Sequence, residues 1–499
     1  ESGTGGRDTG TGGDAPTCEE QCPENASCVL KGTSANCECD EGFEADGDAC
    51  VDIDECEEED RCDESATCDN TEGSYECTCE ADLHGDGYRC LPRTRLVSVS
   101  LTGQPGNDSS ASPSLSDDGR FVAFVSHATD LVSNDENREW DVFVFDAEAE
   151  KVSRVSVNSA GAEANDLSHV PSISGDGRYV VFSSEANNLV PSDVNGFGDI
   201  FRHDRMTGQT IRINVASNGA ASNSPMTGAP YPSLSFDGNL ASFSSLATNL
   251  VSGDTNDARD IFVRNVSAGT TLRVNLKENG GQTSSGTTSG HCSVISGSGR
   301  YVVFSSDASE LGGTDGIVDI YRRDLEESVT DLVTYALPQS RLRDDAANPS
   351  VSADGRFVVF ESAASSLVPE DKNEMSDVFL RDMETGTIEL VSVSSAGDSA
   401  NGHSHLSCLR SVSADGRFVV FSSEATNLVD GDTNGKTDVF VRDRMRQTTT
   451  RVSVGANGEQ WDLNSIEATI SADGKVIAFR TGALNDSPGS SQIWRRYLD

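Results

Sequence analysis

The sequence predicts an all-β fold, in which a seven-bladed β-propeller of four-stranded blades follows two small disulfide-rich modules. Two observations lead to this prediction. Twelve of the 14 cysteines lie between Cys18 and Cys90, so the first part of the chain differs in kind from the rest. Beyond Arg93 a short turn motif occurs seven times at a nearly constant spacing, which indicates a repeat architecture.

The repeated motif is a turn dipeptide that precedes an apolar strand. Successive copies are 58, 61, 61, 56, 61 and 58 residues apart. In each repeat, a Ser-containing strand, the turn and a strand such as 356–360 form a predicted hairpin, because Asp-Gly favours tight β-turns. The seven dipeptides are Asp118-Gly119, Asp176-Gly177, Asp237-Gly238, Ser298-Gly299, Asp354-Gly355, Asp415-Gly416 and Asp473-Gly474.

Two further strands complete each repeat. The third follows a polar loop and reads Asp-Val-Phe-Val at 141–144, and the fourth reads Arg-Val-Ser-Val at 154–157. Four short antiparallel strands repeated radially leave few exposed sheet edges. The chain enters this region with a fourth-type strand at 94–100 and leaves with a third-type strand at 492–498. We therefore expect the N-terminal strand to complete the last blade and close the ring.

The blade motifs also carry a family resemblance. Pro-Ser-x-Ser-x-Asp-Gly-Arg-x-Val-x-Phe and Asn-Leu-Val-x-x-Asp-x-Asn resemble the TolB-like, WD-like (PD40-type) propeller repeats of bacterial exported proteins. The resemblance spans residues 94–499. It implies the propeller fold and leaves the function open, because propellers host many unrelated activities. An open solenoid is the weaker alternative, since its terminal repeats should resemble caps rather than halves.

Composition excludes several functional classes. The 82 acidic and 37 basic side chains give a formal net charge of −45, which argues against nucleic-acid binding. Apolar runs of about five residues are far shorter than the roughly 20 residues that a membrane span needs. The chain starts at Glu1 without an apolar signal segment, so we expect that a targeting peptide was cut off or left out.

The N-terminal region divides into three parts. Residues 1–17 are rich in Gly and Thr and read as a spacer. Two cysteine-rich modules follow at 18–50 and 51–92, and the propeller occupies 93–499. Dense cysteine in small modules points to disulfides, which persist in oxidising compartments. We therefore expect a secreted or cell-surface protein.

The two modules repeat the same order of cysteine gaps. The cysteines lie at 18, 22, 28, 37, 39 and 50, and again at 56, 62, 68, 77, 79 and 90. Spacing alone allows 15 pairings for six cysteines. With their Cys-x-Cys and following glycine turns, the modules resemble EGF-like domains. That resemblance implies the pairs Cys18–Cys28, Cys22–Cys37, Cys39–Cys50, Cys56–Cys68, Cys62–Cys77 and Cys79–Cys90.

The second module also resembles the calcium-binding type of EGF-like domain, through Asp-Ile-Asp-Glu-Cys at 52–56, Cys-Asp-Asn at 68–70 and Tyr-Glu-Cys at 75–77. Calcium takes six to eight oxygen ligands. The resemblance implies side-chain ligands from Asp52, Glu55 and Asn70, and carbonyl ligands from Ile53, Thr71 and Ser74. Only Val51 separates the first module from Asp52, so we expect calcium to stiffen the pair into a short rod. The alternative is that these acidic residues merely solvate a small domain.

Five blades carry Asp-x-Asn-x-x-x-Asp between the second and third strands. Oxygen-bearing side chains at alternate positions suit a calcium loop, whereas Asp and Asn also fold loops by bonding their own backbone. The sequence leaves both interpretations open, with the turn somewhat favoured. The residues are Asp135, Asn137, Asp141, Asp193, Asn195, Asp199, Asp254, Asn256, Asp260, Asp371, Asn373, Asp377, Asp432, Asn434 and Asp438. Blades 4 and 7 depart from the motif at Gly313, Asp315 and Gln492 and should hold no ion.

A second candidate site combines the few histidines and the two remaining cysteines. Counted back from the last serine of each first strand, His169, His291 and Cys408 are equivalent in blades 2, 4 and 6. First strands line a propeller's channel, so these residues are candidates for one channel mouth. The nearby residues are Cys292, His403 and His405. A Cys292–Cys408 disulfide, a zinc or copper site, and unlinked ordinary residues are three open interpretations.

The functional hypothesis is a non-enzymatic binding and assembly protein. The propeller would be an interaction platform and calcium the cofactor that stiffens the EGF-like pair. Partners would be proteins or like subunits, with a glycan as a further possibility. Within this class, an adhesin or receptor-like binder competes with a subunit of an extracellular filament. The rival class is an enzyme, a metal-dependent oxidase or a hydrolase at the channel mouth, although no hydrolase signature is present. A scaffold for periplasmic complexes is a third possibility.

Overall fold

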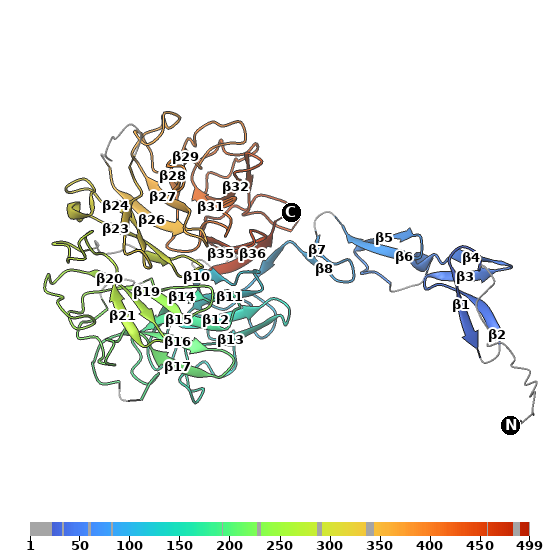
Figure 1. The fold of residues 1–499 in the computed structure, drawn as a ribbon, viewed down its shortest axis with the longest axis horizontal. Helices are drawn as coiled ribbons and strands as arrows, with labels where there is room; N and C mark the ends of the chain where they lie inside the picture. The colour runs from blue at the N-terminus through green and yellow to red at the C-terminus, as the bar shows by residue number, and fades with distance from the viewer. Residues whose placement is uncertain are drawn as a thin grey trace, which may run out of the picture. The chain divides into compact units, whose positions relative to one another are not determined.

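The computed structural model describes residues 22–31, 34–57, 61–80, 83–191, 193–226, 231–286, 292–335, 344–456, 458–482 and 490–498. The chain divides into two compact units, Glu1–Arg93 and Thr94–Asp499 (Figure 1). Both are built from β-strands, as the sequence predicts.

The N-terminal unit consists of short antiparallel hairpins. β1 pairs with β2, β3 with β4, β5 with β6, and β7 with β8. Their bounds, with the one 3-10 turn, are β1 (Ala26–Lys31), β2 (Ser34–Cys39), β3 (Phe43–Asp46), β4 (Ala49–Asp52), η1 (Glu55–Glu57), β5 (Ala66–Thr71), β6 (Ser74–Cys79), β7 (Leu83–Gly85) and β8 (Cys90–Pro92). Two-stranded hairpins bury little apolar surface, so disulfides supply the stability that a core would otherwise give.

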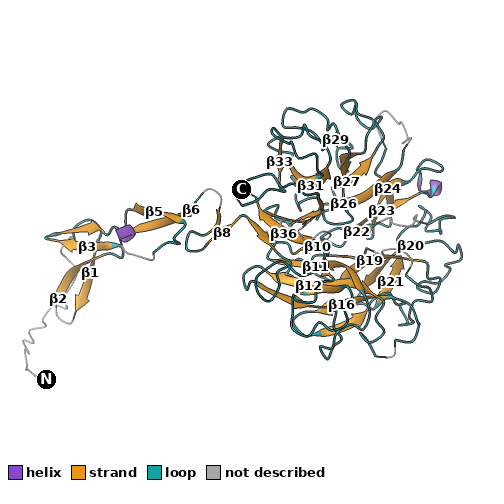
Figure 2. Ribbon diagram, turned by 180° about the vertical axis from the view of Figure 1, so that it is seen from behind, coloured by secondary structure: helices purple, strands orange, loops and turns teal. Residues whose placement is uncertain are grey.

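The second unit is a propeller. Its described residues form seven four-stranded sheets, each in simple sequential order and arranged as blades (Figure 2). The first three blades are β10 (Ser110–Leu115), β11 (Phe121–Ser126), β12 (Asp141–Asp146) and β13 (Lys151–Arg154); β14 (Ser168–Ile173), β15 (Tyr179–Ser184), β16 (Asp199–Asp204) and β17 (Gln209–Arg212); and β18 (Ser233–Leu234), β19 (Leu240–Ser245), β20 (Asp260–Asn265) and β21 (Thr270–Arg273).

The other four blades follow the same plan. They are β22 (Ser293–Ile295), β23 (Tyr301–Ser306), β24 (Asp319–Asp324) and β25 (Thr330–Leu332), with η2 (Ser309–Leu311) in a loop; β26 (Ala346–Val351), β27 (Phe357–Ser362), β28 (Asp377–Asp382) and β29 (Ile388–Leu390); β30 (Ser404–His405), β31 (Phe418–Ser423), β32 (Asp438–Asp443) and β33 (Thr448–Arg451); and β34 (Ser465–Ile470), β35 (Val476–Gly482), β36 (Ser491–Tyr497) and β9 (Thr94–Leu96).

Each predicted hairpin turn is held by its own polar residues. In blade 1, Ser116 Oγ donates to Asp118 Oδ1 at 2.7 Å, and the same oxygen accepts from the Arg120 backbone N–H at 2.9 Å. Gly119 has a φ of +69°, and a Cβ there would come within 2.5 Å of Val476 in the neighbouring blade. The glycine is therefore required both by the turn and by the packing of one blade on the next.

The apolar cores lie between adjacent blades. The cluster around Phe124 and Phe143 of blade 1 also contains Val476, Ala478 and Ile493 of blade 7. In most blades the second and third strands contribute an aromatic pair, such as Phe124 and Phe143 with ring centroids 5.8 Å apart. Such a core forms only when a neighbouring blade is present, so each blade depends on its two neighbours.

A ring of backbone hydrogen bonds joins the blades around the channel. The residue one or two positions after the last serine of each first strand donates its N–H to a carbonyl of the next blade, at 2.8–3.2 Å. The donors are Asp117, Gly175, Phe236, Ser298, Ala353, Ala414 and Asp473, and the respective acceptors are Gly175, Phe236, Gly297, Ala353, Ala414, Ala472 and Asp117. Because the seventh bond returns to blade 1, the ring is closed.

The N-terminal strand completes the last blade, which confirms the closure predicted from the sequence. β9 pairs with β36, and Figure 1 shows it beside the C-terminal strands. Ser98 Oγ donates to Gln492 Oε1 at 2.6 Å, and both residues are buried. Gln492 Nε2 in turn donates to the carbonyls of Gly106 and Asp108, each at 3.1 Å. Gln492 therefore ties the two chain ends of the propeller together.

Replacing this glutamine should loosen the closure. We expect Gln492→Ala to lower the free energy of unfolding by about 2–3 kcal/mol, because it removes the acceptor of the buried Ser98 hydroxyl and the donor to two carbonyls. Chemical denaturation measures the change, with Gln209→Ala on an exposed strand position as the control. Equal midpoints for the two variants would contradict this role.

Five hairpins have a second stabilising contact, in which an arginine forms an ion pair with the aspartate at the end of the third strand. In blade 5, Arg356 Nε and Nη2 donate to Asp382 at 3.0 and 2.7 Å. This bidentate pair is the main cause that lowers the pKa of Asp382 to about 2. Since the folded-state pKa lies below the unfolded one, the pair stabilises the fold above about pH 4, and that contribution is lost as the pH falls toward 2.

The ion pair between Arg356 and Asp382 predicts that the effect of a mutation on stability depends on pH. Arg356→Gln should lower the thermal unfolding midpoint at pH 7 and have a much smaller effect near pH 2.5, where the carboxylate begins to take up its proton. Calorimetry of the variant and of the unmodified chain at both pH values measures this. A deficit of the same size at both pH values would show that the arginine acts through packing alone.

Candidate functional sites

The predicted calcium ligands of the second cysteine-rich module lie at its junction with the first. Asp52 ends β4, and its Oδ2 accepts from Asn70 Nδ2 at 2.8 Å. Its Oδ1 accepts from the Gly73 N–H at 2.5 Å. A Cβ on Gly73 would come within 2.7 Å of the Phe43 ring, so this glycine lets the first module approach. Asp52 and Asn70 are therefore held together where the two modules meet.

Glu55, the third predicted side-chain ligand, lies on η1. It is buried, and its Oε2 has no hydrogen-bond partner among the described residues. A buried carboxylate oxygen without a donor needs a counter-charge. Ile53 is anchored by a hydrogen bond from its N–H to the Gly42 carbonyl, and Thr71 pairs with Ser74 across the hairpin turn. The donor set of carboxylates, an amide and carbonyls fits calcium.

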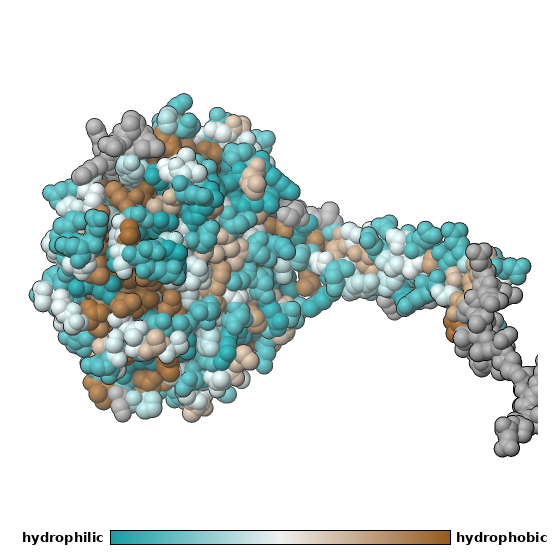
Figure 3. Space-filling view, viewed as in Figure 1, coloured by the Kyte–Doolittle hydropathy of each residue, from teal (hydrophilic) through white to brown (hydrophobic). Residues whose placement is uncertain are grey.

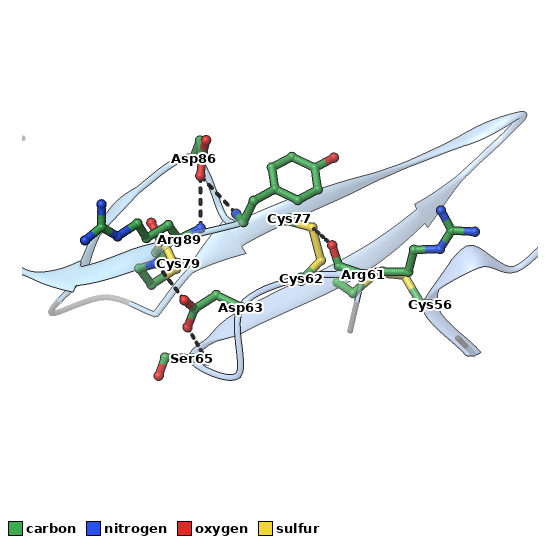
Figure 4. Close-up of a disulfide and its surroundings, with 12 residues drawn as sticks. Cys56, Arg61, Cys62, Asp63, Ser65, Cys77, Cys79, Asp86 and Arg89 are labelled. Atoms are coloured by element: carbon green, nitrogen blue, oxygen red, sulfur yellow. Dashed lines mark hydrogen bonds between the residues drawn. A yellow bond between two sulfur atoms is a disulfide. The ribbon is translucent and has the colours of Figure 1, made fainter. Parts of the chain in front are cut away.

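The same module is folded by other acidic residues that act as internal acceptors. Asp63 accepts from the backbone N–H groups of Ser65 and Cys90 at 2.9 and 3.0 Å, as Figure 4 shows. The bond from Cys90 is the main cause that lowers the pKa of the Asp63 carboxyl. Asp86 likewise caps the turn at Tyr88 and Arg89. These carboxylates are structural and separate from the calcium-type cluster.

Five disulfides are described in this unit. They join Cys22 to Cys37, Cys39 to Cys50, Cys56 to Cys68, Cys62 to Cys77, and Cys79 to Cys90, with Cα atoms 5.5–5.7 Å apart. They are the pairs that the EGF-like resemblance implies. The sixth, Cys18–Cys28, falls partly on a residue outside the described part of the chain.

In the propeller, the Asp-x-Asn-x-x-x-Asp loops are tight turns closed by their own side chains. In blade 1, Asn137 Oδ1 accepts from the Glu139 N–H at 2.8 Å, and its Nδ2 donates to Asp141 at 3.0 Å. Asp141 is fully buried and accepts from Ser156 Oγ on the fourth-strand side at 2.5 Å. Burial is the main cause that raises the pKa of Asp141 to about 6. The last aspartate thus joins two strands of one blade.

An arginine of the fourth strand neutralises these loops in four blades. Arg212 Nη1 lies 3.0 Å from Asp193 and 2.6 Å from Asp199 in blade 2. Arg273 lies 3.3 and 3.1 Å from Asp254 and Asp260. The corresponding groups are Arg154 with Asp135 and Asp141 in blade 1, and Arg451 with Asp432 and Asp438 in blade 6.

The loop motif alone did not indicate this counter-charge. A signal was nevertheless present in the sequence. In all four blades, the arginine stands two residues before the serine or asparagine that donates a hydrogen bond to the last aspartate. In blade 1 Glu163 joins the group and contacts Arg154 directly. Asp135, Asp141 and Glu163 form the one cluster of at least three His, Cys, Asp or Glu with metal-compatible spacing that the described residues contain. There the guanidinium already contacts all three carboxylates.

Cys292 and Cys408 form a disulfide that links blades 4 and 6, with Cα atoms 5.5 Å apart. It passes the first strand of blade 5, where Asn348 Oδ1 lies 3.6 and 3.4 Å from the two sulfur atoms. Asn348 Nδ2 also donates to Glu361, and burial is the main cause that raises the pKa of this carboxyl. The bridge is therefore part of a packed network at the channel.

The strand register corrects one assignment. His169 pairs with Ser183 in blade 2, and the residue in the same register in blade 6 is His405, which pairs with Ser422. Cys408 is therefore not the equivalent of His169. In blade 6, three more residues than in blade 2 separate the start of the first-strand pairing from the last serine. An equivalence obtained by counting back from that serine is therefore wrong by three positions. The extra residues carry Cys408 inward, toward Cys292.

The histidines do not gather into a described metal site. His403 Nδ1 accepts from the Ser376 N–H at 3.1 Å, and its ring centroid lies 6.0 Å from that of His405. His405 lies 3.8 Å from Glu361. His169 is half-buried, and this burial lowers its pKa. His291 lies outside the described residues.

The channel is narrow and is crossed by a side chain. Arg410 of blade 6 lies over the Phe236 ring of blade 3, 4.7 Å from its centroid, and Nη1 is 3.3 Å from Asp117 of blade 1. The cavity that Arg410 and Phe236 line has a volume of about 50 Å³. A drug-sized ligand needs several hundred Å³. This cavity is therefore too small for a ligand of that size.

The comparisons with known proteins concern mainly the N-terminal unit. The model of the EGF domain family matches residues 56–90, which contain three of the disulfides and the hairpin β5–β6. Residues 56–90 form an EGF domain. Rat (Rattus norvegicus) uromodulin is 38% identical over 94 residues, covering 19% of this chain and 14% of uromodulin.

Two further relatives match short stretches of the chain. Mouse (Mus musculus) nidogen-1 is 39% identical over 65 residues, which are 13% of this chain and 5% of nidogen-1. Vacuolar-sorting receptor 4 of Arabidopsis thaliana is 48% identical over 73 residues, 14% of this chain and 12% of the receptor. The chain thus spans a small fraction of the length of each relative.

Solved structures resemble the propeller at low identity. TolB from Acinetobacter baumannii has 17% identity and a TM-score of 0.37, and the match covers 67% of this chain and 64% of TolB. The β-propeller domain of the Trilobed protease from Pyrococcus furiosus has 9% identity and a TM-score of 0.45, with 78% and 95% coverage. The seven-bladed architecture rests on the strand pairing described above. Within the described residues, no helix has the length and apolar character of a membrane span.

The inter-blade disulfide gives a testable expectation. Replacing both Cys292 and Cys408 by alanine should lower the free energy of unfolding by about 2–5 kcal/mol, since the bridge restricts a long loop in the unfolded chain. Thermal unfolding of the double variant and the unmodified chain measures this. Alkylation of the unfolded, unreduced protein should label neither cysteine, and labelling of both would contradict the bridge.

Proposed function

We propose that this chain is a secreted or cell-surface binding protein without catalytic activity. The propeller is the interaction platform, and calcium stiffens the EGF pair beside it. The observation that carries the proposal is the acidic cluster at the junction of the two N-terminal modules. There, Asp52 accepts a hydrogen bond from Asn70, and Oε2 of the buried Glu55 has no hydrogen-bond partner among the described residues. A structural ion at that point would fix the angle between the modules and present them as one binding unit.

The disulfides support the location. An oxidising compartment is where such bonds persist, and the EGF domain matches proteins such as uromodulin and nidogen-1 in that region. The net charge of −45 supports a protein partner rather than a nucleic acid. It also favours calcium, because a divalent cation offsets the repulsion between closely spaced carboxylates.

The propeller contributes surface rather than a reaction centre. Its described channel is filled by Arg410, and the buried carboxylates of its loops are mostly paired with arginines. Hydrophilic side chains dominate the visible surface, with smaller hydrophobic patches among them (Figure 3). Loops between the second and third strands are the expected contact region, because loops on a rigid scaffold commonly carry binding residues. A protein, including a second copy of this chain, is the expected partner.

Calcium binding at the EGF junction is tested by one pair of variants. Glu55→Gln should weaken binding of calcium to the EGF site about tenfold or more, because it removes one ligand charge. Glu57→Gln, at an exposed position of the same turn, is the matched control and should leave the affinity unchanged. Calorimetric titration of the full chain with calcium chloride measures both, and equal affinities would refute the assignment.

Electron microscopy separates the two forms of the binding hypothesis. Filaments in calcium that disperse on chelation, and are lost in Glu55→Gln, would support a calcium-dependent structural subunit. Single particles under every condition would remove self-assembly and favour binding of a different protein or of a glycan.

A further inference from the structure

One position on the fourth strand distinguishes the blades from one another. It pairs with the central aromatic residue of the third strand in every blade, so its equivalence follows from register rather than from alignment. The residues at this position in blades 1 to 7 are Arg154, Arg212, Arg273, Leu332, Leu390, Arg451 and Leu96.

The identity of this residue follows the charge of the adjacent loop, with one exception. Blades 1, 2, 3 and 6 keep both aspartates of the loop and have the arginine that contacts them. Blade 4 has Gly313 in place of the first aspartate, blade 7 has Gln492 in place of the last, and both have leucine at the fourth-strand position. In both of these blades, the loop thus has one carboxylate fewer and the fourth strand has no arginine at this position.

Blade 5 breaks this rule. It retains Asp371 and Asp377, yet Leu390 stands where the arginine would be. Asp371 is 5% exposed and Asp377 is fully buried. Oδ2 of each carboxylate is buried and has no hydrogen-bond partner among the described residues. Two buried negative groups without a counter-charge are unfavourable at neutral pH.

The contacts of Asp377 show that the pair keeps the geometry of the other blades. Ser392 Oγ donates to Asp377 Oδ1 at 2.6 Å, as Ser156 does to Asp141 in blade 1. Asn373 Oδ1 accepts from the Met375 N–H at 2.8 Å and so forms the same turn. Blade 5 lacks the guanidinium of the other four blades, because Leu390 stands at that position.

We propose that a calcium ion bound by Asp371 and Asp377 replaces the missing arginine in blade 5. Two carboxylates balance the charge of one divalent ion, and hard oxygen donors are what calcium selects. In blade 1, Arg154 Nη2 also donates a hydrogen bond to the Asn134 carbonyl at 2.8 Å. The matching carbonyl in blade 5 belongs to Glu370 and accepts a hydrogen bond from Ser399 Oγ at 2.8 Å. Glu370 and Leu390 line a groove of about 350 Å³.

This inference narrows the calcium prediction from five propeller loops to one. In the other four, a guanidinium contacts the carboxylates that an ion would need. The proposal is independent of the proposed function, because the blade 5 ion stabilises the propeller and the EGF ion joins the N-terminal modules.

The test uses the full chain, calcium chloride alone as the titrant, and variants that move the arginine between blades. Leu390→Arg should reproduce the arrangement of blade 6 and bind one calcium ion fewer than the unmodified chain. Arg451→Leu should reproduce the arrangement of blade 5, because Ser453 donates to Asp438 as Ser392 does to Asp377, and should bind one ion more. Calorimetry gives the stoichiometries. Glu55→Gln reports separately on the EGF site.

Thermal unfolding provides the second readout. The unmodified chain should unfold at a lower temperature in EDTA than in calcium, and Leu390→Arg should recover most of that loss in EDTA. If Leu390→Arg fails to fold, Asp371→Asn tests the same site and should also bind one ion fewer. The same calcium stoichiometry in Asp371→Asn or in folded Leu390→Arg as in the unmodified chain would overturn the proposal.

Discussion

The propeller depends on closure of a ring of seven backbone hydrogen bonds, each from one blade to the next around the channel. A single blade is a small four-stranded sheet whose apolar faces are covered only by its neighbours, as the shared cluster of Phe124, Phe143 and Val476 illustrates. The ring sets the distance at which these faces meet. The last bond, from Asp473 to Asp117, exists only because β9 completes blade 7 and brings the two chain ends of the propeller together.

A second constraint is the burial of charge within each blade. The last aspartate of the loop lies inside the blade and accepts hydrogen bonds from the fourth-strand side, as Asp199 does from Asn214. Burying that carboxylate is costly unless a positive group is near. Four blades meet this need with an arginine of the same sheet, two have lost a carboxylate, and blade 5 keeps both without the arginine. The seven blades thus serve as internal comparisons for one another, and we interpret the exception as a site for an ion.

Much of the architecture could be predicted because it depends on local patterns. The spacing of the Asp-Gly turns predicts seven hairpins, and the half-blades at the two ends predict closure through β9. At turn positions such as Gly119, the residue type itself indicates the backbone conformation, because glycine readily adopts a positive φ. By contrast, the bulges of the first strands could not be predicted from residue type. They lie at residues that adopt a positive φ although they are not glycine, namely Ser112, Val170, Asn348 and Glu467.

The parts that sequence reasoning missed depend on contacts across strands and blades. The Asp-x-Asn-x-x-x-Asp motif reads as a ligand set when taken alone, and the arginine that neutralises it lies on the next strand. Three additional residues displace the first strand of blade 6. They bring Arg410 across the channel, and they also move Cys408 away from the position expected from spacing. The path of a bulged strand depends on what it packs against, so neither feature follows from spacing.

The most direct test of the central claim, that the closed ring makes the blades one cooperative unit, is native-state hydrogen exchange of the ring amides. The backbone N–H groups of Asp117, Gly175, Phe236, Ala414 and Asp473 each donate one bond of the ring. The account predicts that they exchange only through global unfolding, with the same free energy of opening in every blade. Earlier exchange at Asp473, with the other amides still protected, would show that blade 7 opens alone and would contradict the closed ring.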